Sequence, residues 1–233
     1  MAKRFHGKLG EEYELFKLAC PHFDSIQRGL AKAIKTHYPT ARTALEVGFG
    51  SGYTTSFVLS QNPSMHVTAI DNEDIMVKQA RHNLKDSIFD GKVDLVLADA
   101  LPFLSRCPPR HFDVIYSAFT LHNFDSSYRA RVLAEIYRVL GKEGLFVNGD
   151  KYAFSNPNMH RKSLEWQLKQ FDVYDYMGRP DIKREWTSHY LEDNQPDVVM
   201  RENEAIHLMN GIGFKDIKRI FRRHMEAILF ARK

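Results

Sequence analysis

The sequence predicts an α/β protein with a doubly wound, mostly parallel sheet and a small helical cap. Between residues 43 and 148, short apolar runs alternate with segments of helical periodicity, as in parallel strands joined by crossover helices. Two further strand-like runs, residues 216–221 and 227–231, lie about five residues apart near the end of the chain. Because parallel neighbours need a much longer crossover, this pair is expected to form a hairpin and to add an antiparallel strand to the sheet.

Each predicted element rests on a local pattern. Pro21 suits the first turn of a helix, and Phe23, Ile26, Leu30 and Ile34 recur behind it at helical spacing. The strands before the hairpin are expected at residues 43–47, 66–70, 93–98, 112–116 and 145–148. The helices are expected at residues 11–19, 21–37, 53–61, 73–85, 126–140 and 202–210.

The length of 233 residues suits one domain with a cap. Residues 1–40 are expected to form helices that cover the ligand site, and residues 41–150 to form the ligand-binding core. Residues 151–200 are polar and aromatic, and we expect them to be an inserted cap that contacts the substrate. Residues 201–233 then supply the last helix and the hairpin that completes the core.

Composition limits the possible partners. The formal net charge is +4, and the two cysteines lie far apart without an export signal, so no disulfide is expected. No segment approaches ~18 apolar residues, so we expect no membrane span and a cytoplasmic location. A monomer or a homodimer is expected. The basic run of residues 215–224 alternates between two faces of a strand, and Arg222 and Arg223 fall in the expected hairpin turn. It therefore predicts a solvated edge strand, and nucleic acid is not an expected partner.

The stretch ALEVGFGSGYTT, residues 44–55, predicts a ligand-binding turn between a strand and a helix. A phosphate-binding P-loop would need a lysine after its last glycine, and Tyr53 follows Gly52 here. The dinucleotide fingerprint G-x-G-x-x-G differs by one residue from the spacing of Gly48, Gly50 and Gly52. Glu46 stands two residues before the first glycine, where its carboxylate would repel a pyrophosphate and would suit a cationic ligand.

Two more carboxylates follow the next strands. Asp71 ends the second strand, where a carboxylate can accept hydrogen bonds from both hydroxyls of a ribose. Asp99 ends the third strand, where it can accept from an adenine amino group. Each has an ordinary structural alternative, a charge at a helix N-terminus for Asp71 and a turn residue for Asp99. Together with Glu46 they indicate a site for a ribose, an amino-purine and positive charge.

These motifs resemble those of the class I S-adenosylmethionine-dependent methyltransferases. The similarity covers about residues 40–150 and the terminal hairpin, with residues 46–52 as the E/D-x-G-x-G-x-G loop and residues 112–124 and 135–150 as later motifs. It departs from the family at residues 142–144, where Lys-Glu-Gly replaces the usual proline-glycine pair of a turn. The family implies a Rossmann-like seven-stranded sheet of order 3-2-1-4-5-7-6 with strand 7 antiparallel.

The resemblance implies S-adenosylmethionine as cofactor and methyl transfer as activity. Its cofactor-binding positions fall on Glu46, Gly48, Gly50, Gly52, Asp71, Asn72, Asp99, Ala100 and Ser117, with Tyr13 covering the cofactor. Methyl transfer to a neutral nitrogen or to sulfur needs no base, whereas a hydroxyl or acidic carbon needs one. His122 is the candidate base, with a structural role as the alternative, and no metal ligands are expected.

The acceptor is expected to be a small molecule, anionic or aromatic, because residues 151–200 combine aromatic and basic side chains. Trp166, Arg184 and Tyr190 are the candidate substrate contacts, and an aromatic cover packed on the sheet is the alternative. The C-terminal part is also similar in layout to carboxy-S-adenosylmethionine synthase of the tRNA wobble-uridine pathway, with Arg184 at the position that would hold the added carboxylate. A cofactor-binding module without turnover is the third alternative.

Overall fold

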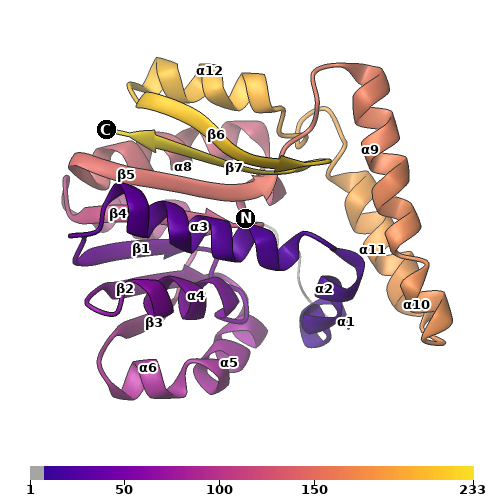
Figure 1. Ribbon diagram of the computed structural model, residues 1–233, viewed down its shortest axis with the longest axis horizontal. Helices are drawn as coiled ribbons and strands as arrows, with labels where there is room; N and C mark the ends of the chain where they lie inside the picture. The colour runs from indigo at the N-terminus through magenta and orange to yellow at the C-terminus, as the bar shows by residue number, and fades with distance from the viewer. Residues whose placement is uncertain (1–7) are drawn as a thin grey trace.

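The computed structural model describes residues 8–233, and its centre is one seven-stranded sheet of order β3-β2-β1-β4-β5-β7-β6 (Figure 1). The strands are β1 (Thr43–Val47), β2 (His66–Asp71), β3 (Val93–Leu97), β4 (Phe112–Ala118), β5 (Leu140–Lys151), β6 (Lys215–Arg223) and β7 (Glu226–Arg232). Strands β1 to β5 pair in parallel, and β7 pairs antiparallel with both β5 and β6. The predicted fold class, strand order and antiparallel strand are therefore confirmed.

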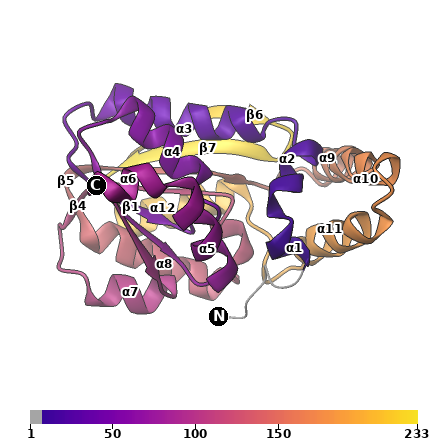
Figure 2. The ribbon, with the colours of Figure 1, turned by 90° about the horizontal axis from the view of Figure 1, so that it is seen from below.

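Helices cover both faces of this sheet. One buried cluster joins α3 (Phe23–His37), α4 (Tyr53–Gln61) and α5 (Asp74–Asn83) to one face of the sheet. The other joins α7 (Ala100–Arg106), α8 (Ser126–Val139) and α12 (Glu202–Ile212) to the opposite face, as Figure 2 shows for most of these helices. Helix α6 (Lys85–Phe89) and helix α7 were not predicted from the sequence. The apolar stripe of α3 is fully buried, which explains its strong sequence pattern.

The cap stands beyond the carboxyl ends of the strands (Figures 1 and 2). It contains α9 (Pro157–Gln170), α10 (Val173–Tyr176) and α11 (Pro180–Glu192). Three short N-terminal elements, α1 (Lys8–Glu11), η1 (Tyr13–Leu15) and α2 (Phe16–Ala19), lie between the cap and the sheet. Residues 1–7, part of the expected N-terminal cover, lie outside the described residues.

Side chains tie the cap to these N-terminal elements. The ring of Trp186 stacks on Phe16 with centroids 4.5 Å apart. The hydroxyl of Tyr174 donates to the Leu15 carbonyl at 3.1 Å, and the Gln167 amide donates to the Ala19 carbonyl at 2.7 Å. Cap and N-terminal segment thus form one cover over the end of the sheet. None of the helices between residues 8 and 233 combines the length and apolar character needed to cross a membrane.

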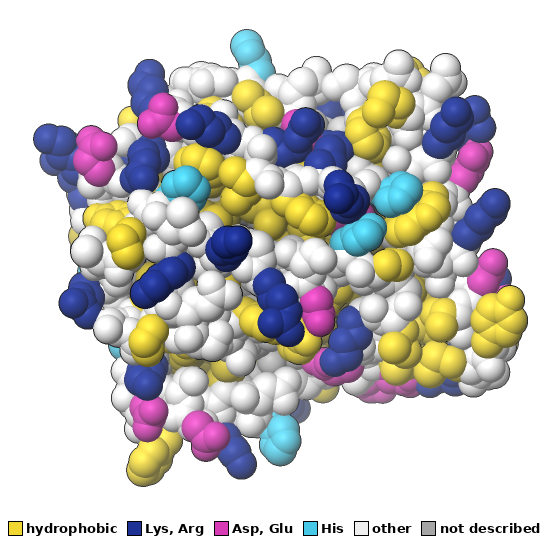
Figure 3. Space-filling view, in the orientation of Figure 1, with side chains coloured by type: hydrophobic (Ala, Val, Ile, Leu, Met, Phe, Trp, Pro, Cys, Tyr) yellow, Lys and Arg dark blue, Asp and Glu magenta, His cyan; other side chains and the backbone are white. Residues whose placement is uncertain are grey.

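The predicted position of the hairpin turn was wrong. Strand β6 continues to Arg223 and pairs with β7 as far as Glu226, which leaves a two-residue turn. His224 makes this turn possible with a positive φ of 49°. Arg222 consequently points inward as part of the strand, where its guanidinium packs on Phe154 and bonds Glu202. On the face drawn in Figure 3, lysine and arginine side chains are scattered among other types and do not form one basic patch.

Candidate cofactor and acceptor site

A cleft opens at the carboxyl ends of the parallel strands, the usual place for a ligand site in such a sheet. Four segments line it, and each lies at or just past the end of one of the strands β1 to β4. These are residues 47–51, 70–73 and 98–100, together with residues 118–120, 123 and 124. Tyr13 lines the cleft from the N-terminal cover, and Tyr128 lines it from α8.

The glycine loop forms the floor of the cleft through Gly48 and Gly50. Gly48 has a φ of +74°, and a Cβ on it would overlap the side chain of Thr120. Gly50 has a φ of +54°, but a Cβ there would meet nothing nearer than the Tyr13 ring at 3.9 Å. Gly48 therefore allows the loop to pack on the segment after β4, whereas Gly50 leaves its backbone open to the cleft. Gly52, the residue before α4, does not line the cleft. It packs instead against the side chain of Leu84.

Asp71 is held at the edge of the cleft by two backbone groups. Its Oδ2 accepts from the Gly50 N–H at 2.9 Å, and its Oδ1 accepts from the Glu73 N–H at 3.0 Å. Burial raises the pKa of Asp71 to about 6. Asn72, a predicted cofactor contact, follows it on the cleft wall. The carboxylate therefore joins the glycine loop after β1 to the end of β2.

Asp99 and Ala100 also line the cleft, where β3 leads into α7. The hydroxyl of Tyr128 donates to Oδ1 of Asp99 and accepts from the Leu101 N–H at 3.0 Å. Tyr128 was not predicted, since it lies on α8, 29 residues later, and belongs to no motif. It fixes the orientation of the Asp99 carboxylate within the cleft.

Glu46 does not reach the cleft, which corrects the expectation that its charge faces a cationic ligand. Its carboxyl lies fully buried beneath the loop, where Oε2 accepts from the Thr55 hydroxyl at 2.5 Å and the Tyr116 hydroxyl at 2.9 Å. Burial raises the pKa of Glu46 to about 8, which favours the uncharged carboxyl. Ser117 is also absent from the cleft wall, because its hydroxyl donates to the Val47 carbonyl at 2.8 Å.

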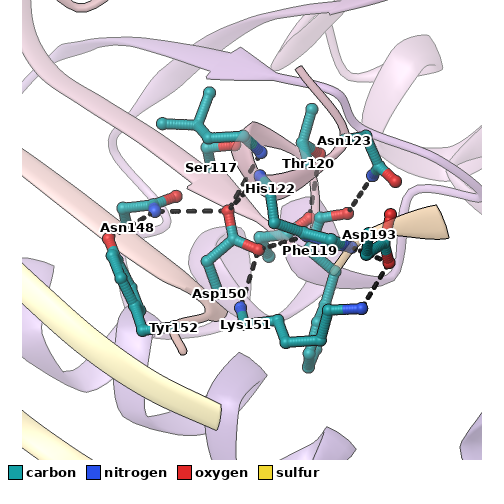
Figure 4. A network of polar contacts seen from close by, with 12 residues as sticks. Ser117, Phe119, Thr120, His122, Asn123, Asn148, Asp150, Lys151, Tyr152 and Asp193 are labelled. Atoms are coloured by element: carbon teal, nitrogen blue, oxygen red, sulfur yellow. Dashed lines mark hydrogen bonds and ion pairs between the residues drawn. The ribbon is translucent and has the colours of Figure 1, made fainter. Parts of the chain in front are cut away.

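His122 lies in a buried polar network next to the cleft (Figure 4). Its Nδ1 donates to Oδ1 of Asp150 at 2.5 Å, and Oδ2 of the same carboxylate accepts from the Leu121 N–H at 2.9 Å. Its Nε2 lies 3.6 Å from Oδ2 of Asp193, at the end of α11 in the cap. The ammonium of Lys151 pairs with the same Asp193 carboxylate. His122 sits on the short helix η2 (Leu121–Asn123), and its neighbour Asn123 lines the cleft.

The three residues expected to contact the substrate are not brought together. Trp166 packs on the hairpin turn, with its ring 3.6 Å from that of His224. Arg184 is exposed on α11 and does not line the cleft. Tyr190 is buried beside the network, with the Lys151 ammonium 3.6 Å above its ring. Trp186, which was not predicted, is the cap residue whose ring lies near Tyr13, with centroids 6.3 Å apart.

Comparisons with known proteins agree with this geometry. A family model described as a methyltransferase domain matches residues 44–144. The chain is 22% identical to carboxy-S-adenosyl-L-methionine synthase from Campylobacter concisus over 90% of its own length and 85% of that protein. It is 30% identical to the ubiquinone/menaquinone biosynthesis C-methyltransferase from Psychromonas ingrahamii, over 73% of this chain and 65% of the relative.

A solved structure has the same fold along the whole chain. The S-adenosyl-L-methionine-dependent methyltransferase structure from Methanococcus maripaludis superposes with a TM-score of 0.63 at 18% identity, covering 100% of this chain and 97% of that one. The sheet order, the glycine loop and the matched domain all lead to one assignment. The chain thus contains a methyltransferase domain at residues 44–144, within a sheet of the strand order expected for the class I S-adenosylmethionine-dependent methyltransferases.

Proposed function

We propose that the cleft binds S-adenosylmethionine with its ribose at Asp71 and its adenine near Asp99 and Ala100. Three features support this fit. Gly50 carries no Cβ where the loop faces the cleft, Asp71 lines the cleft at the end of β2, and Asp99 and Ala100 line it just after β3. Tyr13 covers the cleft from the N-terminal segment.

We further propose that the protein transfers the methyl group to a small molecule that must lose a proton, most simply a hydroxyl compound. When bound, the cofactor supplies an electrophilic methyl group on a positively charged sulfur. The observation that carries the proposal is the His122–Asp150 pair, joined at 2.5 Å beside the cleft wall. Asp150 holds the Nδ1 proton, so Nε2 keeps the lone pair that accepts the proton of the acceptor.

The cap controls access to this nitrogen. Asp193 lies 3.6 Å from Nε2 of His122, so an acceptor reaches Nε2 when the end of α11 moves aside. The surrounding side chains are aromatic: Phe16 contacts both Trp186, with centroids 4.5 Å apart, and Phe119, with centroids 6.0 Å apart. Phe119 also lines the cleft. A planar or aromatic acceptor fits between such rings.

A carboxy-S-adenosylmethionine synthase-like activity is the second candidate, because the relative of that name matches 90% of this chain. That activity needs a cation to hold the added carboxylate. The arginine expected for this task, Arg184, is exposed and absent from the cleft wall. This placement favours methyl transfer over the carboxylated cofactor and leaves a binding module without turnover as the remaining alternative.

Mass spectrometry of the ligand retained on purification separates the first two candidates. S-adenosylmethionine or its demethylated product is expected, and a carboxylated derivative would instead support the synthase. Turnover is then measured as formation of the demethylated cofactor with a panel of hydroxylated aromatic acceptors.

His122→Ala should lower kcat by about 100-fold or more, the usual contribution of a general base, while cofactor affinity changes less than about twofold. His160→Ala is the matched control, since this cap histidine bonds Asn194 at 2.7 Å, outside the pair with Asp150. Unchanged kcat in His122→Ala would exclude His122 as the base.

A further inference from the structure

Three buried side chains from two distant parts of the chain bring ligand atoms close together. His122 comes from the segment after β4, and His189 and Asp193 come from α11 and its C-terminal end. One ligand atom from each residue lies within 4.8 Å of the ligand atoms of the other two. The three residues are 7%, 5% and 3% exposed, so the group lies in the interior between core and cap.

The distances suit a small divalent metal ion. Oδ2 of Asp193 lies 3.6 Å from Nε2 of His122 and 3.7 Å from Nε2 of His189. Ligand atoms on a tetrahedral zinc ion with bonds of about 2.0–2.1 Å lie about 3.4 Å apart, so shifts of a few tenths of an ångström bring these pairs into range. His189 and Asp193 are four residues apart on α11, which places both on one face of the helix.

The group also has the outer contact that metal-binding histidines usually have. Nδ1 of His122 donates to the buried Asp150 carboxylate at 2.5 Å, which directs the Nε2 lone pair toward Asp193 and His189. Two imidazoles and one carboxylate form a donor set typical of zinc sites with three protein ligands.

Lys151 is the cation that competes for this position. Its ammonium pairs with the Asp193 carboxylate and lies 3.6 Å above the ring of Tyr190. A metal ion at the group must therefore displace Lys151 from Asp193, and the repulsion between the two cations lowers the affinity for the metal.

We propose that His122, His189 and Asp193 bind one divalent transition metal ion, and that the bound ion inhibits methyl transfer by occupying Nε2 of His122. The metal site itself is independent of the reaction. The inhibition rests on the proposed function, because it requires Nε2 as the proton acceptor.

Cobalt(II) and zinc(II) are the probes. Cobalt(II) added to the full chain should give the visible absorption bands of a tetrahedral site, and one equivalent of zinc(II) should abolish them. Zinc affinity by calorimetry should fall at least tenfold in His189→Ala and Asp193→Asn, and should rise at least tenfold in Lys151→Met. His224→Ala is the control, since the rings of His22 and His224 lie 6.2 Å apart at the surface and can bind metal adventitiously.

Thermal melting shows whether a variant is folded. If His189→Ala and Asp193→Asn misfold, the expected rise of zinc affinity in Lys151→Met still tests the site. Absence of the cobalt bands in both the wild type and Lys151→Met overturns the metal site, as does loss of binding in His224→Ala alone. Zinc binding with undiminished methyl transfer overturns the inhibition. If no acceptor is found, the cobalt spectrum and zinc affinities still decide the metal site, so its failure is distinguishable from that of the proposed function.

Discussion

Replacing Asp71 with alanine should weaken S-adenosylmethionine binding by about 100-fold. The carboxylate already accepts the Gly50 and Glu73 N–H groups at 2.9 and 3.0 Å, and each oxygen has a second lone pair for a ribose hydroxyl. A hydrogen bond to a charged group contributes about 1.5–3 kcal/mol. Two bonds at the lower value amount to about 3 kcal/mol, which corresponds to about 100-fold in Kd.

The pH dependence of the affinity separates charge from shape. Burial raises the pKa of Asp71 from its ordinary 3.8 to about 6, and only the ionised carboxylate accepts from all of these donors. Affinity should therefore be full above about pH 7 and should fall as the pH drops through 6. Asp71→Asn keeps the shape without the titration, so its affinity should be lower than that of the wild type at pH 8 and nearly constant down to pH 5.

Titration calorimetry at pH 5, 6, 7 and 8 measures both effects. Thermal melts of each variant provide the control, because the loss of the Gly50 contact also loosens the loop. An Asp71→Ala protein with wild-type affinity at pH 8 would refute the ribose assignment. A pH dependence that persists in Asp71→Asn would show that another group titrates.

The other predictions concern stability and packing. Burial raises the pKa of Glu46 from 4.5 to about 8, so the unfolded chain ionises at lower pH than the folded protein. The free energy of unfolding should therefore fall by up to ~1.4 kcal/mol per pH unit as the pH rises between these values. Denaturant titrations of Glu46→Gln should lack this fall. Gly48→Ala should unfold at lower temperature than Gly50→Ala, since only the first new Cβ overlaps another side chain, whereas cofactor binding should weaken in both. Trp186→Ala should cost about 3–5 kcal/mol in urea unfolding, because the ring is 2% exposed and stacked in the cover; a loss under 1 kcal/mol would contradict this packing.

The sequence predicted those helices whose buried face is made of apolar residues. Helix α3 buries Ile26, Leu30 and Ile34, and its periodic apolar residues located it correctly. Helix α9 instead buries Ser163 and Gln167, so its pattern lacks the apolar stripe that would have located it within residues 151–200. Where the buried face is polar, hydrophobic periodicity carries no signal.

The candidate site was predictable where a motif and a strand end coincide. Asp71 ends β2 and Asp99 lies two residues after β3, and topology alone brings them to one cleft. Glu46 belongs to β1, one residue before the strand ends, and the sequence does not reveal that Thr55 and Tyr116 enclose its carboxyl. Its expected position facing the ligand was wrong because burial depends on neighbours up to 70 residues away.

The N-terminal segment connects the two halves of the proposed site. Glu14 accepts from the hydroxyl of Ser51 in the glycine loop at 2.9 Å, and Glu12 accepts from Arg179 of the cap at 2.8 Å. Tyr13, between these two glutamates, lines the cofactor cleft and has its ring 6.3 Å from that of Trp186 in the cap. A shift of the glycine loop on cofactor binding would therefore reach this segment and, through it, the cap. Since Asp193 at the end of the cap helix lies beside Nε2 of His122, we infer that cofactor binding and acceptor access are energetically coupled.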